Sequence, residues 1–343
     1  MKDQFTCKRT LRATLAAAMI SAGLCPAWGA VQSSSEVWVG SASLIQGSGN
    51  SASRMSMFSL RMTRPLETAG VVSSLQNAVL TDTNSVWTDH QFGTAGVAAY
   101  VEFDNGWMAD IADTSTANQS LNLAGSLGNA VSAGSHYRLR KHSTIASIFG
   151  ANNEAGLKSG SNPSMADNIL LEDPQTQRVI TIFYYSDTTF HGWLDATFSP
   201  VDNLIIYPEQ GVMIRRRVAT DLNIYLAGPV KVGPAVVTLD VGNNLVGTLK
   251  SATPLTLPAL NLYSGDAATG LASGSNPSGS DNLLVVQPDG SVATYFFYSD
   301  LSYQGWLDAS FNIADGVQIQ PGSAFFIRRK APNAAFNWTI PAE

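Results

Sequence analysis

The sequence predicts an all-β protein with two tandem, related modules of the β-sandwich or partly closed barrel type, the first interrupted by a small inserted β-barrel. Three observations support this fold class. Short runs rich in Val, Ile, Tyr, Phe and Trp are bounded by Gly, Pro, Asn and Asp, which is typical of strands and turns. No stretch keeps apolar residues at helical spacing for more than two turns. A long segment is repeated within the chain, and its first copy is divided in two.

Residues 1–29 have the pattern of a secretory signal peptide. A cationic start is followed by an apolar run at 15–24 and by small residues around 27–29, the order typical of such a peptide. The apolar run is too short to cross a bilayer, which requires about 20 residues. Cys25 makes a lipoprotein the nearer alternative, although residues 22–24 do not form a lipobox. We therefore expect an exported bacterial protein, located in the periplasm, on the cell surface or outside the cell.

Cleavage of this peptide would remove both cysteines of the chain, Cys7 and Cys25. The mature chain would then hold no disulfide, no thiolate nucleophile and no cysteine-based metal site. We expect such a protein to be stabilised by ordinary core packing.

The strongest signal in the sequence is the internal repeat. Residues 156–170 return at 270–284, and the motif Gly-Trp-Leu-Asp-Ala at 192–196 returns at 305–309. The motif Ile-Arg-Arg that ends at Arg216 returns with its end at Arg329. The two segments are therefore expected to fold alike.

The repeat divides the mature chain into three predicted parts. The first module comprises residues 30–66 and 143–228, and the second comprises residues 229–343. Residues 67–142 form the predicted inserted barrel, since weak similarities to the start of the second module lie before this segment. Insertions of this kind are usually made at loops. The alternative is a separate N-terminal domain at 31–142, followed by two shorter repeats.

The predicted inserted barrel has six strand-like segments. They are residues 70–75, 78–81, 97–103, 106–111, 120–124 and 136–141. The dipeptide Asn105-Gly106 lies between two of them and is a strong signal for a β-hairpin. Beyond this part of the chain, a short helix is expected near residues 144–149.

Further motifs extend over nearly all of the mature chain. They are the segments 58–65 and 70–75, the Tyr-Tyr/Phe-Tyr-Ser-Asp stretches with the Gly-Trp that follows, and the segment 321–329. In these motifs the chain resembles an uncharacterised family of exported, β-rich proteins from Verrucomicrobia and related bacteria. The resemblance implies export and a β architecture, and it implies no particular chemistry.

Composition and motifs argue against several classes of function. Charged residues make up only 13% of the chain, and acidic residues outnumber basic ones by 26 to 20, whereas nucleic-acid binders carry a basic surface. No later segment reaches 18 apolar residues, so we expect no membrane span after cleavage. The four histidines lack metal-binding spacing, and no nucleophile elbow or Walker loop is present. We therefore expect no enzyme, no cofactor and no metal centre.

The candidate ligand-binding residues are Trp193, Asp195, Trp306 and Asp308, which the repeat places at equivalent positions. An exposed Trp beside an Asp would suit a sugar, which stacks on the indole and hydrogen-bonds to the carboxylate. The alternative interpretation is a core Trp and an Asp that hydrogen-bonds within its own turn. The repeated aspartates also leave weak calcium binding open.

Two basic runs, Arg215–Arg217 and Arg328–Lys330, end the last strong strand of each predicted module. They would suit an anionic polymer, or they would protect an edge strand from pairing with another chain, which is the interpretation we favour.

These observations predict an exported, non-enzymatic structural or interaction protein of the cell surface or secreted space. The alternative is a carbohydrate-binding protein that uses Trp193 and Trp306. The expected partner is an unknown surface polymer, glycan or protein, and nucleic acid is not expected.

Overall fold

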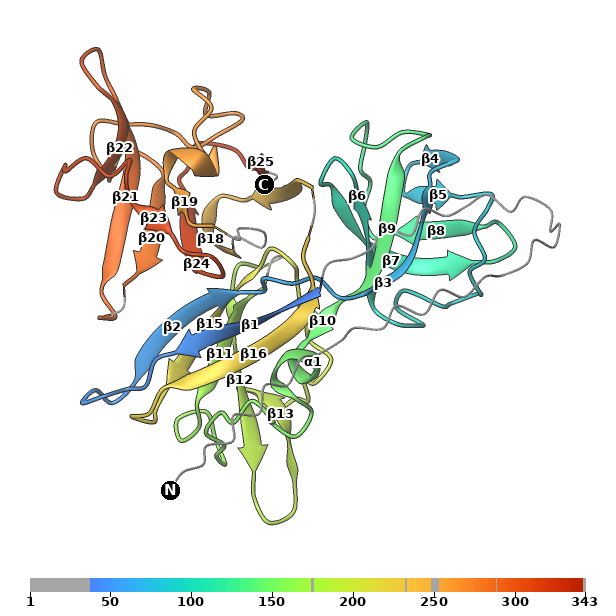
Figure 1. The fold of residues 1–343 in the computed structure, drawn as a ribbon, viewed down its shortest axis with the longest axis horizontal. Helices are drawn as coiled ribbons and strands as arrows, with labels where there is room; N and C mark the ends of the chain where they lie inside the picture. The colour runs from blue at the N-terminus through green and yellow to red at the C-terminus, as the bar shows by residue number, and fades with distance from the viewer. Residues whose placement is uncertain (1–37, 174–175, 232, 248–252, 288, 342–343) are drawn as a thin grey trace, which may run out of the picture. The chain divides into compact units, whose positions relative to one another are not determined.

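The computed structural model describes residues 38–173, 176–231, 233–247, 253–287 and 289–341. The predicted signal peptide, residues 1–29, lies outside these described residues. All of the described residues belong to one compact unit, 35–343. Strands make up nearly all of its regular structure (Figure 1), so the predicted all-β class is confirmed. None of the helices in the described ranges is long and apolar enough to cross a membrane.

Five antiparallel strands form the first large sheet, in the order β13-β12-β11-β15-β2. They are β2 (Arg54–Ser59), β11 (Asn168–Glu172), β12 (Val179–Ser186), β13 (His191–Asp195) and β15 (Gly211–Arg216). One face of the sheet packs on a core that includes Ile182, Trp193 and Ile214. Shorter elements contribute to the same core: β1 (Trp38–Ile45), α1 (Ile145–Phe149), β14 (Ile205–Ile206) and β16 (Leu222–Pro229). The short strand β10 (Ser143–Thr144) pairs with β14.

The helix α1 lies where the sequence predicts a short helix. Thr144 precedes it, and the Thr144 side chain accepts a hydrogen bond from the backbone N–H of Ser147. The Ser147 hydroxyl in turn pairs with the backbone of Thr144, which completes a capping box. Ile145 and Phe149 bury the helix against the first core.

The second large sheet has the order β22-β21-β20-β24-β18. Its strands are β18 (Gly242–Gly247), β20 (Asn282–Val286), β21 (Val292–Ser299), β22 (Gln304–Asp308) and β24 (Ala324–Arg329). The shorter elements are β17 (Ala235–Leu239), β19 (Leu255–Thr256), the 3₁₀ helix η1 (Pro258–Leu260), β23 (Gln318–Ile319) and β25 (Phe336–Ile340).

The two large sheets correspond strand by strand. Tyr184 pairs with Trp193 in the first sheet, and Phe297 pairs with Trp306 in the second. The ribbon β1–β16 has its counterpart in β17–β25, and the pair β10–β14 has its counterpart in β19–β23. This correspondence is what the internal repeat leads us to expect. The assignment of the parts as separate domains stays a prediction.

A seven-stranded sheet, in the order β3-β9-β6-β7-β8-β5-β4, is formed between residues 66 and 141. Its strands are β3 (Leu66–Val71), β4 (Ser74–Gln76), β5 (Val79–Thr81), β6 (Ala99–Phe103), β7 (Met108–Ser115), β8 (Ser120–Leu123) and β9 (His136–Lys141). The hairpin predicted at Asn105-Gly106 is confirmed, since β6 pairs with β7 and Gly106 has a φ of 90°. The sheet has its own core, which includes Leu80, Phe92 and Val101.

The inserted barrel that the sequence predicts is not closed by strand pairing. β3 and β4 stand at the two ends of the sheet, and no ladder joins them among the described residues. The reason lies in the predicted single strand 70–75, which is divided at Val72 and Ser73. Val72 donates to the carbonyl of Ser135 beside β9, whereas Ser73 donates to the carbonyl of Thr81 on β5. The chain therefore passes from β3 at one end of the sheet to β4 at the other end, and these two strands do not pair with each other.

Candidate functional site

The two candidate tryptophans lie in the cores and not on the surface. Trp193 on β13 is 0% exposed, and Trp306 on β22 is 1% exposed. Strand alternation turns each indole toward its core, where Trp193 packs against Tyr184 and Phe149. The Nε1 of Trp193 donates to the carbonyl of Gly150 at 2.7 Å. The predicted sugar stacking on these two rings is wrong, because neither ring is accessible to a ligand.

The two candidate aspartates organise the loops that follow these tryptophans. Asp195 Oδ1 accepts hydrogen bonds from the backbone N–H groups of Thr197, at 2.8 Å, and Ser199, at 3.0 Å. Asp308 accepts from the loop 310–312 in the same way. The hydroxyl of Thr197 has the largest effect in lowering the pKa of Asp195. Both carboxylates therefore serve their own turns. Within the described ranges, no group of three or more His, Cys, Asp or Glu side chains is placed to hold a metal ion.

Each of these loops holds a phenylalanine in a backbone conformation that phenylalanine rarely adopts. Phe198 has a φ of 64° and Phe311 a φ of 65°, in the left-handed region. Glycine favours this region because it has no Cβ, and it usually fills this position in short hairpin loops. Phe198 is 51% exposed and Phe311 is 52% exposed. Bulky residues in this conformation are true outliers, and such outliers cluster at functional sites.

Phe198 packs on an aromatic cluster at the edge of the first sheet that β12 and β13 form. Its ring packs edge-on against Phe183, with 5.8 Å between centroids, and against Tyr185, with 6.2 Å. Phe190 is 46% exposed, and its ring lies 5.9 Å from that of Tyr185. The hydroxyl of Tyr185 donates to Asp187 at 2.7 Å, which orients the tyrosine. We call Tyr185, Phe190 and Phe198 the first aromatic surface.

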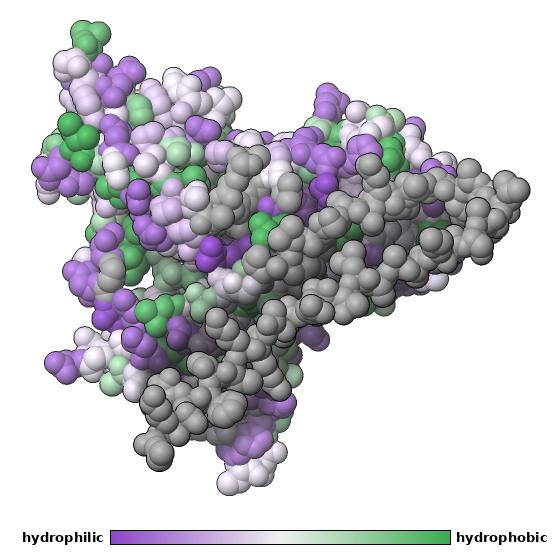
Figure 2. Space-filling model, viewed as in Figure 1, coloured by the Kyte–Doolittle hydropathy of each residue, from purple (hydrophilic) through white to green (hydrophobic). Residues whose placement is uncertain are grey.

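The same arrangement recurs on the second sheet. Phe311 packs edge-on against Phe296, with 5.8 Å between centroids, and Tyr298 lies 6.2 Å from Tyr303. The hydroxyl of Tyr298 donates to Asp300 at 2.6 Å. We call Tyr298, Tyr303 and Phe311 the second aromatic surface. Figure 2 shows hydrophobic groups among hydrophilic ones at the upper left of the view, where Figure 1 places β21 and β22 with their loops.

The basic runs do not mark edge strands, which corrects the prediction made for them. β15 lies between β11 and β2, and β24 lies between β20 and β18. Arg216 is 3% exposed and forms a buried ion pair with Asp167. Arg329 is 1% exposed and pairs with Asp281 at 2.6 Å. The central arginine of each run therefore lies inside its sheet, paired with a buried aspartate.

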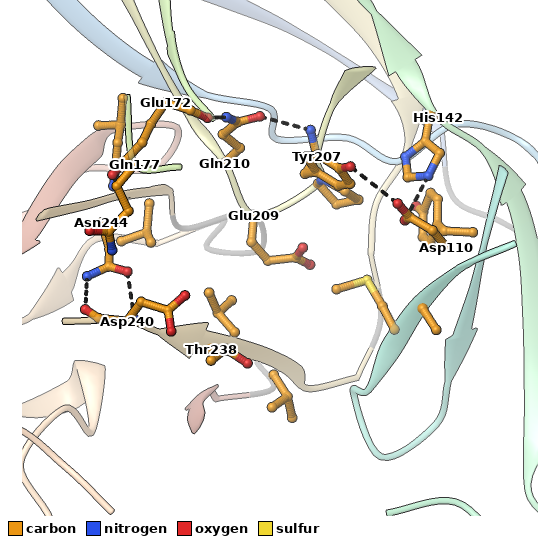
Figure 3. A pocket seen from close by; sticks show the side chains of 18 residues that line it. Asp110, His142, Glu172, Gln177, Tyr207, Glu209, Gln210, Thr238, Asp240 and Asn244 are labelled. Carbon is orange, nitrogen blue, oxygen red and sulfur yellow. Dashed lines mark hydrogen bonds and ion pairs between the residues drawn. The ribbon is translucent and has the colours of Figure 1, made fainter. Parts of the chain in front are cut away.

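A cavity of about 280 Å³ lies where the seven-stranded sheet meets the two large sheets (Figure 3). Glu209 stands in the middle of the lining side chains, between Asp110, His142 and Tyr207 on one side and Glu172 on the other (Figure 3). The Nε2 of His142 is 3.0 Å from Asp110 Oδ1, and the Tyr207 hydroxyl donates to Asp110 Oδ2 at 3.2 Å. Most of the remaining lining is apolar, contributed in part by β7, β17 and β18.

Buried charges lie behind this cavity. Lys231 Nζ is 3.0 Å from Glu102 and 3.7 Å from Glu209, and Arg140 Nε donates to Glu102 at 3.3 Å. All four residues are less than 9% exposed. Burial raises the pKa of Glu209 to about 7, although the positive charge of Lys231 opposes this rise. The four groups come from separate segments of the chain, so no local sequence pattern indicates their meeting.

Glu172, at the end of β11, is a second buried carboxyl of the cavity. It is 8% exposed, and it accepts a hydrogen bond from the backbone N–H of Leu245 on β18. Burial raises the pKa of Glu172 to about 7, and the Leu245 N–H opposes this rise. No cation is paired with the Glu172 carboxylate among the described residues.

The variant Glu172→Gln is expected to be more stable than the wild type at pH 8 and equally stable at pH 4.5. The pKa of Glu172 is higher in the folded state than in the unfolded state. The contribution of this carboxyl to the free energy of unfolding is therefore complete below the unfolded-state pKa of about 4.5, and it is lost as the pH rises through about 7. Glutamine keeps the acceptor for Leu245 and removes the buried charge. We expect a gain of about 1–2 kcal/mol at pH 8, which is the full linkage value discounted for remaining solvation.

Urea unfolding at the two pH values measures this difference. Glu154→Gln is the matched control, because hydrogen bonds from its own backbone and from Asn152 lower the pKa of the exposed Glu154. The control variant should gain no stability at pH 8. An equal effect of Glu172→Gln at both pH values would contradict the assignment of a buried, unpaired carboxyl.

No protein-family model matches the chain, and searches of curated proteins and of solved structures find no match either. The membership implied by the resemblance to the exported Verrucomicrobia family therefore stays a prediction.

Proposed function

We propose that the protein is an exported, non-enzymatic interaction protein that binds a carbohydrate polymer through its two aromatic surfaces. The observation that carries this proposal is the pair Phe198 and Phe311. Both are half-exposed, and both are held in left-handed backbone at equivalent positions of the two large sheets. A residue type that is unfavourable for the loop at both positions suggests selection for the ring itself.

Two equivalent surfaces on one chain favour a partner that presents the same unit many times. A single aromatic contact of this size is expected to be weak. Two such contacts engaged together raise the overall affinity without any new contact, since the second binding event becomes intramolecular. A polymer with a repeating unit meets this requirement better than a partner with a single epitope.

The chemistry around the rings favours a sugar as that unit. The apolar face of a sugar ring stacks on an aromatic ring, and its hydroxyls require neutral hydrogen-bonding neighbours. The first aromatic surface is flanked by Thr189, Thr197 and Ser199, and the second by Ser302 and Asn312, all of them exposed. Each of the four loops also holds one aspartate, Asp187, Asp195, Asp300 or Asp308, whose carboxylate accepts hydrogen bonds from the backbone of its own loop.

The carboxylates beside the rings support a binding role over a catalytic one. Asp187 accepts hydrogen bonds from the hydroxyl of Tyr185 and from the loop, and these bonds hold its pKa far below the usual range. Asp300 is held in the same way by Tyr298 and by its own loop. Such carboxylates orient the tyrosines and are poorly suited to proton transfer near neutral pH.

The double variant Phe198→Asn/Phe311→Asn tests this proposal. Asparagine tolerates left-handed backbone, so the variant removes both rings while the loops keep their conformation. We expect it to lose at least 90% of the binding of the mature protein to the polysaccharide that the wild type binds. The measurement is co-sedimentation with insoluble cellulose, chitin, xylan and starch granules.

Tyr225→Ala is the matched control. Tyr225 is 75% exposed on β16, outside both aromatic surfaces, and its removal should leave co-sedimentation unchanged. Binding to none of the four polysaccharides, or equal loss in the control and the double variant, would refute the proposal.

A further inference from the structure

The cavity between the seven-stranded sheet and the two large sheets has the features of a second, separate binding site. We propose that it binds a small organic cation, in which an amine or guanidinium group is carried on an apolar body. This site shares no residue with the two aromatic surfaces, so the inference does not depend on the proposed function.

The charge of the cavity favours a cation. Its lining contains four carboxyl side chains and, as the one group able to carry a positive charge, a histidine. The carboxyls are Asp110, Glu172, Glu209 and Asp240, and the histidine is His142. Lys231 and Arg140 lie behind the lining, where Glu102 and Glu209 oppose their charges. With Glu209 set against these two cations, Asp110, Glu172 and Asp240 remain against His142 alone. The lining therefore keeps an excess of carboxyl groups, which disfavours an anionic ligand.

An unsatisfied oxygen in the cavity indicates where the cation would bind. Glu209 is only 8% exposed, yet its Oε1 has no hydrogen-bond donor within the described part of the chain. The nearest positive charge, Lys231 Nζ, is 3.7 Å away, beyond ordinary hydrogen-bond distance. A buried polar atom without a partner costs about 1–3 kcal/mol, so a ligand N–H group that reached Oε1 would recover this loss. Figure 3 shows the Glu209 side chain extending into the middle of the lining residues.

The remaining lining defines the body of the ligand. Val236, Val237 and Val246 supply apolar surface from the second module, and Met108 and Tyr100 supply it from the seven-stranded sheet. A volume of about 280 Å³ corresponds to about nine water molecules at ~30 Å³ each. A ligand with roughly ten non-hydrogen atoms is therefore expected, and its charged end would lie at Glu209.

Isothermal titration calorimetry of the mature protein with phenethylamine and agmatine tests the inference. The neutral control is 2-phenylethanol, which has the shape of phenethylamine without its charge. We expect at least one of the two cations to bind, and 2-phenylethanol to bind at least tenfold more weakly. Because the pKa of Glu209 is raised to about 7, the cation should bind more tightly at pH 8 than at pH 6.

The variant Glu209→Gln locates the site. It should weaken binding of the cation at least tenfold, whereas Glu154→Gln, which removes an exposed carboxylate elsewhere, should not change it. If Glu209→Gln does not fold, Glu172→Gln replaces it, with an expected loss of at least threefold. The double variant Phe198→Asn/Phe311→Asn should bind the cation normally, which separates this site from the aromatic surfaces. No binding of either cation at 10 mM, or equal binding of 2-phenylethanol, would overturn the inference.

Discussion

Replacement of Arg329 by alanine is expected to destabilise the protein by about 3–5 kcal/mol, the usual effect of breaking a buried ion pair. Arg329 Nη1 donates to Asp281 at 2.6 Å and to the carbonyl of Gly270 at 2.9 Å. Its Nε donates to the carbonyl of Ala334, and its guanidinium lies 4.8 Å from the centre of the Phe336 ring. The alanine variant would leave the carboxylate of Asp281 buried without its cation.

The neighbouring arginine provides the control. Arg328 is exposed and donates to Asn243 at 3.0 Å, so Arg328→Ala should change the free energy of unfolding by less than about 0.5 kcal/mol. Urea unfolding followed by tryptophan fluorescence measures both variants. Arg216→Ala should repeat the effect of Arg329→Ala in the first large sheet, because Arg216 pairs with the buried Asp167. Similar small effects of all three variants would show that the basic runs are surface features.

The variant Trp193→Ala is expected to cost about 3–5 kcal/mol of stability, the range for a large aromatic side chain removed from a core. Trp193 is fully buried, and its ring packs edge-on against Tyr184 at 5.1 Å between centroids. Its hydrogen bond to Gly150 also ties the end of α1 to the first sheet. The loss would therefore affect both the core and the helix that covers it.

Phe198→Asn, five residues along the chain, should by contrast change stability by no more than about 1 kcal/mol, since half of Phe198 is exposed. Thermal unfolding measured by circular dichroism compares the two variants. We expect Trp193 to stabilise the fold and Phe198 to bind the ligand. A larger loss of stability in Phe198→Asn than in Trp193→Ala would reverse these roles.

The repeat was the most informative part of the sequence. Two segments with the same motifs formed sheets with the same strand order, and Asn105-Gly106 formed the predicted hairpin. The repeat alone did not reveal which aromatic residues are exposed. The motif Asp-Ala-Thr-Phe at 195–198 and its counterpart Asp-Ala-Ser-Phe at 308–311 could have drawn attention to the phenylalanines, because a loop of this length favours glycine at the fourth position.

Other features depended on long-range packing that no local pattern indicates. Charge often protects an edge strand, so the basic runs predict edge positions. In the structure, β2 and β18 pair with β15 and β24 and place these strands inside the sheets. The cavity joins Asp110, Glu172 and Glu209 from distant segments. Such a site depends on how complete sheets pack against each other. The alternation of apolar and polar residues within one strand does not predict this packing.

The stoichiometry of sugar binding tests most directly the central claim, that the two sheets carry two equivalent sites. The measurement is isothermal titration calorimetry with a short oligosaccharide of the polymer that the protein binds. Two equivalent aromatic surfaces require two sites on the wild type, one site on Phe198→Asn, one site on Phe311→Asn and none on the double variant. A single site on the wild type, or two sites retained by the double variant, would contradict this claim.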